Sequence, residues 1–151
     1  MPQATAISIR PILASDAAPW RDLWTAYLTF YETTLPAPVY DATFARILSG
    51  TAGIHGLIAE RDGVALGLVH YIVHPTCWKI EPVCYLQDLF TTPAARGQGV
   101  ARALIEAVYA RADAMGAPAV YWMTAETNYK GRMLYDKIGV KTPFIKYARR
   151  G

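Results

Sequence analysis

Six residues, Arg96 to Ala101, form the stretch of this sequence with the clearest potential for chemistry. Gly97 and Gly99 lack a Cβ atom, so the backbone there can approach a ligand closely. The amphipathic pattern that follows predicts a helix, whose first N–H groups have no partner within the helix. Those donors and the positive end of the helix dipole favour an anion. We therefore predict that a pyrophosphate is cradled by Arg96, Gly97, Gln98, Gly99, Val100 and Ala101.

Two elements must hold this loop in place. Residues 83–90 are rich in β-branched and aromatic side chains and stop before Pro93, which predicts a strand. Apolar residues then recur at helical intervals from Val100 to Met115, which predicts an amphipathic helix. The loop has neither the Gly-Lys-Ser/Thr of a nucleotide P-loop nor the third glycine of a dinucleotide fingerprint. For the six residues alone, an ordinary turn between strand and helix is the alternative interpretation.

The loop resembles the acetyl-CoA site of the GNAT N-acetyltransferase superfamily. The motif of that site, Arg/Gln-x-x-Gly-x-Gly/Ala, is matched by Arg96, Gly99 and Ala101. The strand-and-helix opening of many GNAT proteins is similar to residues 9–16, and their closing Asn…Tyr…Gly element is similar to residues 128–139.

Three short segments narrow the resemblance. Residues 74–78, 85–89 and 134–139 look most like the histone/polyamine acetyltransferase-type subgroup, with diamine acetyltransferases a more distant resemblance.

The resemblance implies acetyl-CoA as co-substrate. Backbone groups of Leu89, Phe90 and Thr91 are expected to pair with the pantetheine arm, much as an added strand would. Residues 96–101 would hold the pyrophosphate, and Asn128 would bond the pantetheine or thioester end.

The resemblance also implies direct attack of an amine on the thioester, which requires an oxyanion donor and an acid for the departing sulfur. We expect the donor to be a backbone N–H near Leu89 or Phe90 that a strand bulge leaves unpaired. Tyr135 is the expected acid, because a phenol with a reference pKa of about 10 keeps its proton at neutral pH. The alternative for Tyr135 is a side chain that only packs on the last helix.

The group that takes the amine's proton is less evident. Many GNAT enzymes place a glutamate on the fourth strand for this purpose, where this chain has Gln87 followed by Asp88. Neighbouring strand residues point to opposite faces, so only one of the two can face the substrate. We expect Asp88 to hold the ammonium or act as base. The alternatives are a structural aspartate, or a water held by Gln87, Glu32 or a histidine.

An acceptor site is expected at the end of the first predicted helix, where GNAT folds usually build the acceptor lip. Tyr31 and Glu32 end that helix and could hold a cationic amine, whereas Tyr27 falls in the helix's core stripe. Trp122 could wall the channel or could simply be buried in the sheet. Acidic residues are few on this lip, which favours an amino acid or another single amine over a polyamine.

Composition sets broader limits. At 151 residues, 53% hydrophobic and 18% charged, the chain suits one globular domain, residues 1–151. No apolar run reaches the length of a membrane helix, and we see no export signal. Cys77 and Cys84 are expected to be reduced in a cytoplasmic protein. His70 and His74 lack zinc-ligand spacing with either cysteine, so no metal is assigned.

The order of predicted elements is β-α-α-β-β-β-α-β-α-β, a mixed α/β sheet with helices on both faces, which is also the order of GNAT folds. The last predicted strand, residues 144–147, is apolar and could pair with a second copy in a homodimer. Its neighbouring Lys/Arg cluster is more typical of a solvated end than of a nucleic-acid surface.

These observations favour an acetyl-CoA-dependent N-acetyltransferase for a small primary amine, an amino acid or a polyamine. A non-catalytic acyl-CoA-binding module and a protein lysine acetyltransferase are the alternatives.

Overall fold

A computed structural model of the chain describes residues 5–151, and its five strands form one mixed sheet in chain order. The strands are β1 (Ser8–Pro11), β2 (Ile54–Arg61), β3 (Val64–His74), β4 (Val83–Thr91) and β5 (Val120–Tyr121). β1 to β4 pair antiparallel, and β5 runs parallel to β4. This is the mixed sheet that the sequence predicts.

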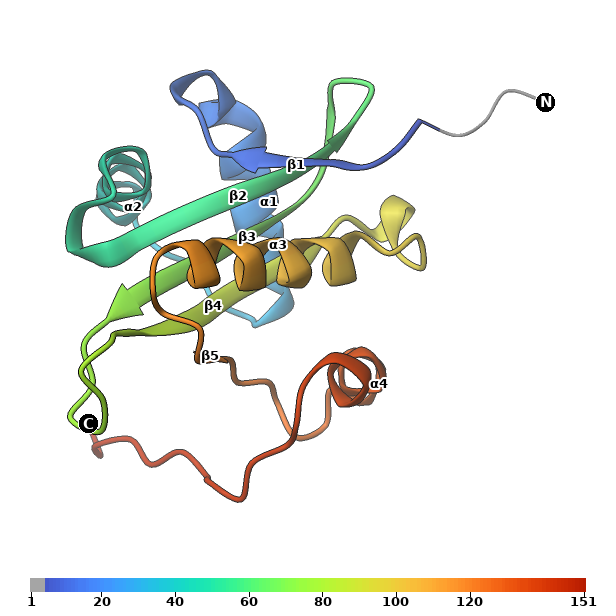
Figure 1. Ribbon diagram of the computed structural model, residues 1–151. Coiled ribbons are helices and arrows are strands. Elements are labelled where there is room, and N and C mark those ends of the chain that lie inside the picture. Colours follow the sequence, from blue (N-terminus) through green and yellow to red (C-terminus); the bar gives the residue numbers. More distant parts are fainter. Residues whose placement is uncertain (1–4) are drawn as a thin grey trace.

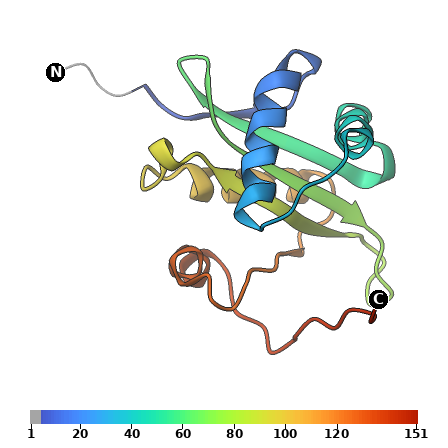
Figure 2. The same ribbon diagram turned by 180° about the vertical axis from the view of Figure 1, so that it is seen from behind.

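Four α-helices cover the sheet: α1 (Ala17–Phe30), α2 (Ala37–Ser49), α3 (Val100–Ala114) and α4 (Tyr129–Ile138). α1 and α2 lie on one face and α3 lies on the other, as Figures 1 and 2 show from opposite sides. Among the described residues, no helix combines the length and apolarity needed to cross a bilayer.

Each face of the sheet has its own apolar core. Under α3, the core includes Leu57, Val69, Leu86, Leu104 and Val108. Under α1 and α2, it includes Trp20, Trp24, Ile58, Leu68 and Phe90. The helical spacing of α3 in the sequence produces this packing, because Val100, Leu104, Ile105, Val108 and Ala112 are all buried. Helices on both faces were predicted, and the two cores confirm them.

The hairpin between β2 and β3 follows directly from its turn residues. Asp62 and Gly63 both have positive φ, 51° and 76°. That is the type I′ geometry that an Asp-Gly pair favours, and its twist matches the twist of the flanking strands.

A β-bulge interrupts β4 at Gln87. Leu86 pairs with Tyr71 and Asp88 pairs with His70, which leaves Gln87 without a partner on β3. The extra residue reverses the alternation of the strand. Before the bulge, Leu86 faces α3, and after it Phe90 faces α1 and α2. The bulge was expected nearer Leu89 or Phe90 and lies two residues earlier.

The start of α1 has no side-chain N-cap. Asp16 precedes the helix, but its carboxylate does not cap it. Both oxygens instead accept hydrogen bonds from the Arg10 guanidinium, at 2.7 and 2.8 Å. A bidentate, charge-assisted pair is stronger than a neutral cap, and it holds the pKa of Asp16 below its usual range.

The C-terminal part departs most from expectation. The strand expected after α3 is only the two residues Val120–Tyr121, and the strand predicted over residues 144–147 does not form. α4 begins after its N-cap Asn128, whose side chain accepts a hydrogen bond from Gly131 N. Otherwise the predicted element order is confirmed.

Candidate active site

Within residues 5–151, one edge of β4 is left without a neighbouring strand over most of its length, and the candidate active site lies along this edge. β5 pairs with β4 only at Cys84 and Tyr85, so in the described chain no strand covers that edge of β4 from Leu86 to Thr91. A pocket lies at this edge between α1 on one side and α3 and α4 on the other. Its lining consists of Tyr27, Tyr31, Leu86, Gln87, Leu89, Ile105, Trp122, Met123 and Tyr135.

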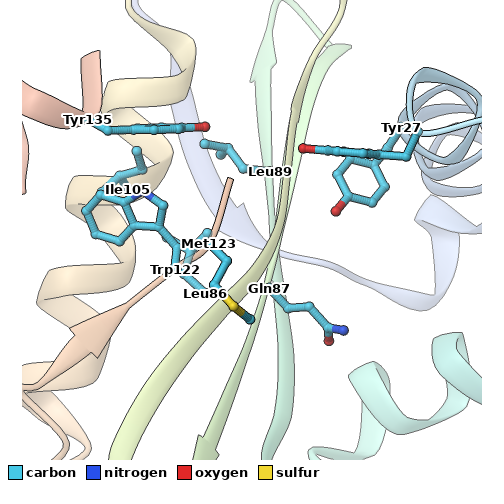
Figure 3. A pocket seen from close by; sticks show the side chains of 9 residues that line it. Tyr27, Leu86, Gln87, Leu89, Ile105, Trp122, Met123 and Tyr135 are labelled. Carbon is cyan, nitrogen blue, oxygen red and sulfur yellow. The ribbon is translucent and has the colours of Figure 1, made fainter. Parts of the chain in front are cut away.

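Tyrosines lie on both sides of the pocket. Figure 3 shows Tyr135 of α4 directing its hydroxyl into the pocket, toward the tyrosines of α1 on the opposite side, with Leu89 between them. Burial raises the pKa of Tyr135 and, secondarily, so does Tyr31. Burial also raises the pKa of Tyr27, with the charge of Asp88 as the next cause. Both phenols therefore keep their protons at neutral pH, and Tyr135 lies where an acid was expected.

Trp122 forms the wall beneath Tyr135. The two rings meet edge to face, with centroids 5.7 Å apart. Gly139, after the end of α4, leaves room for the indole, because a Cβ atom there would lie 2.7 Å from the Trp122 ring. The glycine of the Asn…Tyr…Gly element is thus required for packing, because a larger residue at position 139 would meet the Trp122 ring.

Replacing Gly139 with alanine is expected to displace the Trp122 ring from Tyr135. Overpacking of this kind costs about 1–3 kcal/mol of unfolding free energy. Because Trp122 lines the pocket, KM for the acceptor should rise as well. Urea denaturation and steady-state kinetics would check both effects. An unchanged unfolding midpoint would contradict the expectation that a Cβ atom at Gly139 clashes with the Trp122 ring.

Gln87 and Asp88 point to different places. Gln87 is exposed and lines the pocket. Asp88 is 9% exposed and lies toward α1, where its Oδ2 accepts hydrogen bonds from His70 Nδ1 at 2.8 Å and from Trp24 Nε1 at 3.2 Å. The charge of Asp88 also raises the pKa of Tyr31, after burial, which is the larger cause. The carboxylate therefore lies just behind the α1 wall of the pocket.

The glycine loop has the properties that an anion cradle requires. Gly97 and Gly99 have φ of 77° and 84°, which glycine adopts without strain. A Cβ atom on either residue would meet no atom within 4 Å, so the space in front of the loop is open. No side chain caps α3, and its first turn contains no acidic residue. The main-chain N–H groups of residues 97–101 donate to no other backbone group in the described chain.

Some side chains of the glycine loop already make hydrogen bonds within the protein. Gln98 accepts a hydrogen bond from Arg61 and donates one to the Ala94 carbonyl, which ties the loop to β2 and to the turn before it. Arg96 donates to the Thr91 carbonyl at 3.3 Å. The Thr91 hydroxyl is buried and, within residues 5–151, has no hydrogen-bond partner. An orphaned polar atom beside an open cradle is consistent with a ligand along this edge.

Two predicted site residues, Asn128 and Glu32, do not line the pocket. The Asn128 side chain accepts a hydrogen bond from Gly131 N and donates one to Thr124 Oγ1, which leaves one amide N–H for a ligand. Glu32 is exposed just beyond α1, with a positive φ of 54°, and does not line the pocket. Tyr31, its neighbour, does line it.

Sequence reasoning missed several functional candidates. Tyr27 was assigned to the core, although its spacing of four from Tyr31 put both on one helix face. Leu86, Ile105 and Met123 carried no signal beyond their apolar character. His70 was named only as a metal ligand, and a histidine was otherwise considered only as a group that could hold a water. Among the described residues, no group of three or more His, Cys, Asp or Glu side chains is arranged to hold a metal ion.

Both cysteines are free thiols, one exposed at Cys77 and one buried at Cys84. Burial raises the pKa of Cys84 to about 11, so this thiol stays protonated and unreactive. Neither cysteine lines the pocket.

Comparison with known proteins places the chain in a family. Residues 19–140 match the model of the acetyltransferase (GNAT) family. The D-amino-acid N-acetyltransferase HPA3 of Saccharomyces cerevisiae is 42% identical over 147 residues, which cover 96% of this chain and 91% of the yeast protein. An uncharacterized N-acetyltransferase of Bacillus subtilis, YhfO, is 29% identical, with 94% of this chain and 96% of that protein covered.

Solved structures agree on the fold. The aminoglycoside N-acetyltransferase AAC(6')-Iy in complex with CoA has a TM-score of 0.87 at 23% identity, with 99% of this chain and 98% of that chain covered. A ribosomal-protein-alanine N-acetyltransferase from Brucella melitensis has a TM-score of 0.78 at 22% identity, with 97% and 100% covered. The chain therefore belongs to the acetyltransferase (GNAT) family.

Proposed function

We propose that this protein transfers an acetyl group from acetyl-CoA to the primary amine of a small molecule, with an amino acid as the favoured acceptor. The observation that carries the proposal is the pocket at the open edge of β4, into which Tyr135 directs its hydroxyl opposite the tyrosines of α1. Membership of an N-acetyltransferase family and a D-amino-acid N-acetyltransferase relative support it.

The residues around the open edge of β4 fit acetyl-CoA. Main-chain N–H groups of residues 97–101 would hold its pyrophosphate, as their open, uncapped geometry supports. The free edge of β4 at Leu89, Phe90 and Thr91 would pair with the pantetheine arm. The Asn128 amide N–H that does not bond Thr124 would donate to the thioester end of that arm. When bound, the co-substrate supplies an activated acetyl thioester.

Side chains of the protein would supply the acid, the binding group for the acceptor amine and the walls of the pocket. Tyr135 keeps its proton until a thiolate departs, and then donates it. Asp88 holds the acceptor's ammonium or takes its proton from the α1 side. Gln87, Tyr31 and Trp122 shape the entry to the pocket, and the phenol and indole faces can lie against a cationic amine.

Charge near the pocket bears on the acceptor. The pocket lining contains no charged side chain, and Asp88 is the carboxylate behind it. A single carboxylate suits one ammonium group better than the several of a polyamine. Glu32, the other candidate, lies outside the lining. This arrangement favours an amino acid or another single amine.

Thiol release from acetyl-CoA across a panel of amines would test the proposal. The panel should contain D- and L-amino acids, a diamine, a polyamine and a lysine-containing peptide. We expect turnover with single amines and lower kcat/KM with polyamines and peptide. Absence of turnover with every amine, from protein shown to be folded by circular dichroism, would overturn it.

We also propose that the protein acts in the cytoplasm, because its two free thiols suit a reducing compartment.

We further propose that it forms a homodimer through its C-terminal segment. Val140, Phe144, Ile145 and Tyr147 are between 77% and 91% exposed, and β5 leaves an edge of the sheet unpaired. A second copy could bury these side chains by adding the segment to that edge.

Light scattering at high micromolar concentration should therefore show a dimer. Replacing both Phe144 and Ile145 with aspartate should shift the protein to a monomer, because like charges would be buried at the edge. A wild-type monomer at that concentration would end the proposal.

A further inference from the structure

Behind the α1 wall of the pocket lies a chain of buried side chains that the proposed chemistry has not used. Trp20 Nε1 donates to His70 Nε2 at 2.9 Å, and His70 Nδ1 lies 2.8 Å from Asp88 Oδ2. Trp20 and His70 are 2% and 3% exposed. A buried, hydrogen-bonded set of this kind fixes the position of each member.

The Trp20 indole fixes the tautomer of His70. Indole N–H is a donor only, so His70 Nε2 must accept and carries no proton. The ring proton of the neutral imidazole is then on Nδ1, which donates to Asp88. His70 is therefore neutral and does not cancel the charge of Asp88.

Both donors to Asp88 meet on one oxygen. His70 Nδ1 and Trp24 Nε1 each bond Oδ2, and neither bonds Oδ1. The Tyr27 phenol lies near the same carboxylate, and a hydrogen bond to Asp88 is among the causes that raise the pKa of Tyr27, after burial and the charge of Asp88. The Asp88 side chain retains 12% exposure, and no lysine or arginine of the described chain pairs with it. Its other titratable neighbours are the phenols of Tyr27, Tyr31 and Tyr85, whose pKa values are raised mainly by burial and further by the charge of Asp88. A carboxylate without a cation thus lies beside a neutral pocket.

The β4 bulge is what produces this geometry. If β4 alternated regularly through Gln87, Asp88 would share the face of Leu86 and point toward α3. With the bulge, Asp88 stands directly opposite His70 on the α1 face.

We infer that His70 is a positioning residue: held in one tautomer by Trp20, it binds Oδ2 of Asp88 and thereby leaves Oδ1 for the ammonium group of the acceptor. This inference rests on the proposed function. It assigns His70 and Trp20 to amine recognition, and it predicts that the site selects acceptors that carry a positive charge.

Two His70 variants separate positioning from packing. An asparagine amide can place its N–H near the position of Nδ1, and a glutamine amide reaches only toward Nε2. His70→Asn should therefore keep the bond to Asp88, and His70→Gln should lose it. We expect His70→Gln to lower kcat/KM for the amine about 10–100-fold, as the loss of one charge-assisted bond implies, with KM for acetyl-CoA unchanged. His70→Asn should stay within about threefold of wild type.

His55→Gln is the matched control, because His55 lies on the neighbouring strand, stacked on Tyr71 and outside the pocket lining. It should leave kcat/KM unchanged. Nitrogen-15 NMR of the imidazoles provides a readout that needs no activity: His70 should be neutral with its proton on Nδ1, and Trp20→Phe should release that preference.

The outcomes separate this inference from the proposed function. If no amine is acetylated, the proposed function fails, and the NMR spectra still test the tautomer. If wild type is active but the two His70 variants lose kcat/KM equally, packing explains His70 and the inference is overturned. A proton on Nε2, or an imidazolium at neutral pH, would overturn it as well.

Discussion

Replacing Tyr135 with phenylalanine is expected to lower kcat by about 10²–10⁴-fold, the usual contribution of a general acid. The phenol points into the pocket at the free edge of β4, and in the proposed reaction it protonates the leaving thiolate. Phenylalanine keeps the ring that packs on Trp122, so the pocket wall should survive. Calorimetry should show unchanged affinity for acetyl-CoA, and steady-state kinetics should show the loss in kcat.

Tyr129→Phe provides the control for this change. Tyr129 lies on the same helix but is 70% exposed and outside the pocket lining, so its kcat should equal that of wild type. The pH profile adds a second check. Because the pKa of Tyr135 is raised above its ordinary value near 10, its protonated form persists as pH rises to 10, and no alkaline loss below that pH should arise from it. An unchanged kcat in Tyr135→Phe would remove the acid assignment.

Local signals in the sequence predicted most of the fold. The helical spacing after Gly99 predicted α3, and the apolar residues at that spacing are the ones that α3 buries. The GNAT resemblance is confirmed by the family match, whereas the narrower histone/polyamine subgroup stays a prediction. Tyr135 was found through its spacing from Asn128, which places it on the face of α4 that meets Trp122.

Features that depend on the whole sheet were not predictable in this way. The position of the bulge at Gln87 decides which side of β4 Asp88 faces, and nothing local to Gln87 marks it. The link from Trp20 to His70 joins residues 50 positions apart, so it becomes visible only after α1 packs on the sheet. Residues 144–147 have strand propensity without a partner strand in this chain, and propensity alone does not form a strand.

Gly99→Ala is expected to weaken acetyl-CoA binding about 10–100-fold. Gly99 is the N-cap of α3 with φ 84°, and an added Cβ would stand in the open space before the uncapped N–H groups. Loss of one charge-assisted hydrogen bond to a phosphate accounts for this range. The positive φ adds about 1–2 kcal/mol of strain. Calorimetric titration with coenzyme A would measure the affinity, and thermal unfolding would measure the strain.

Gly116→Ala separates the two effects, because Gly116 lies just beyond the other end of the same helix. Its φ is 72°, and a Cβ there would also meet no atom within 4 Å. The strain should therefore be similar, while the N–H groups of residues 97–101 are untouched. Equal loss of stability in the two variants, with weaker binding only in Gly99→Ala, would assign the pyrophosphate to the N-terminus of α3. Equal binding by both variants would mean that the glycine loop does not hold the pyrophosphate, and the proposed cradle would be wrong.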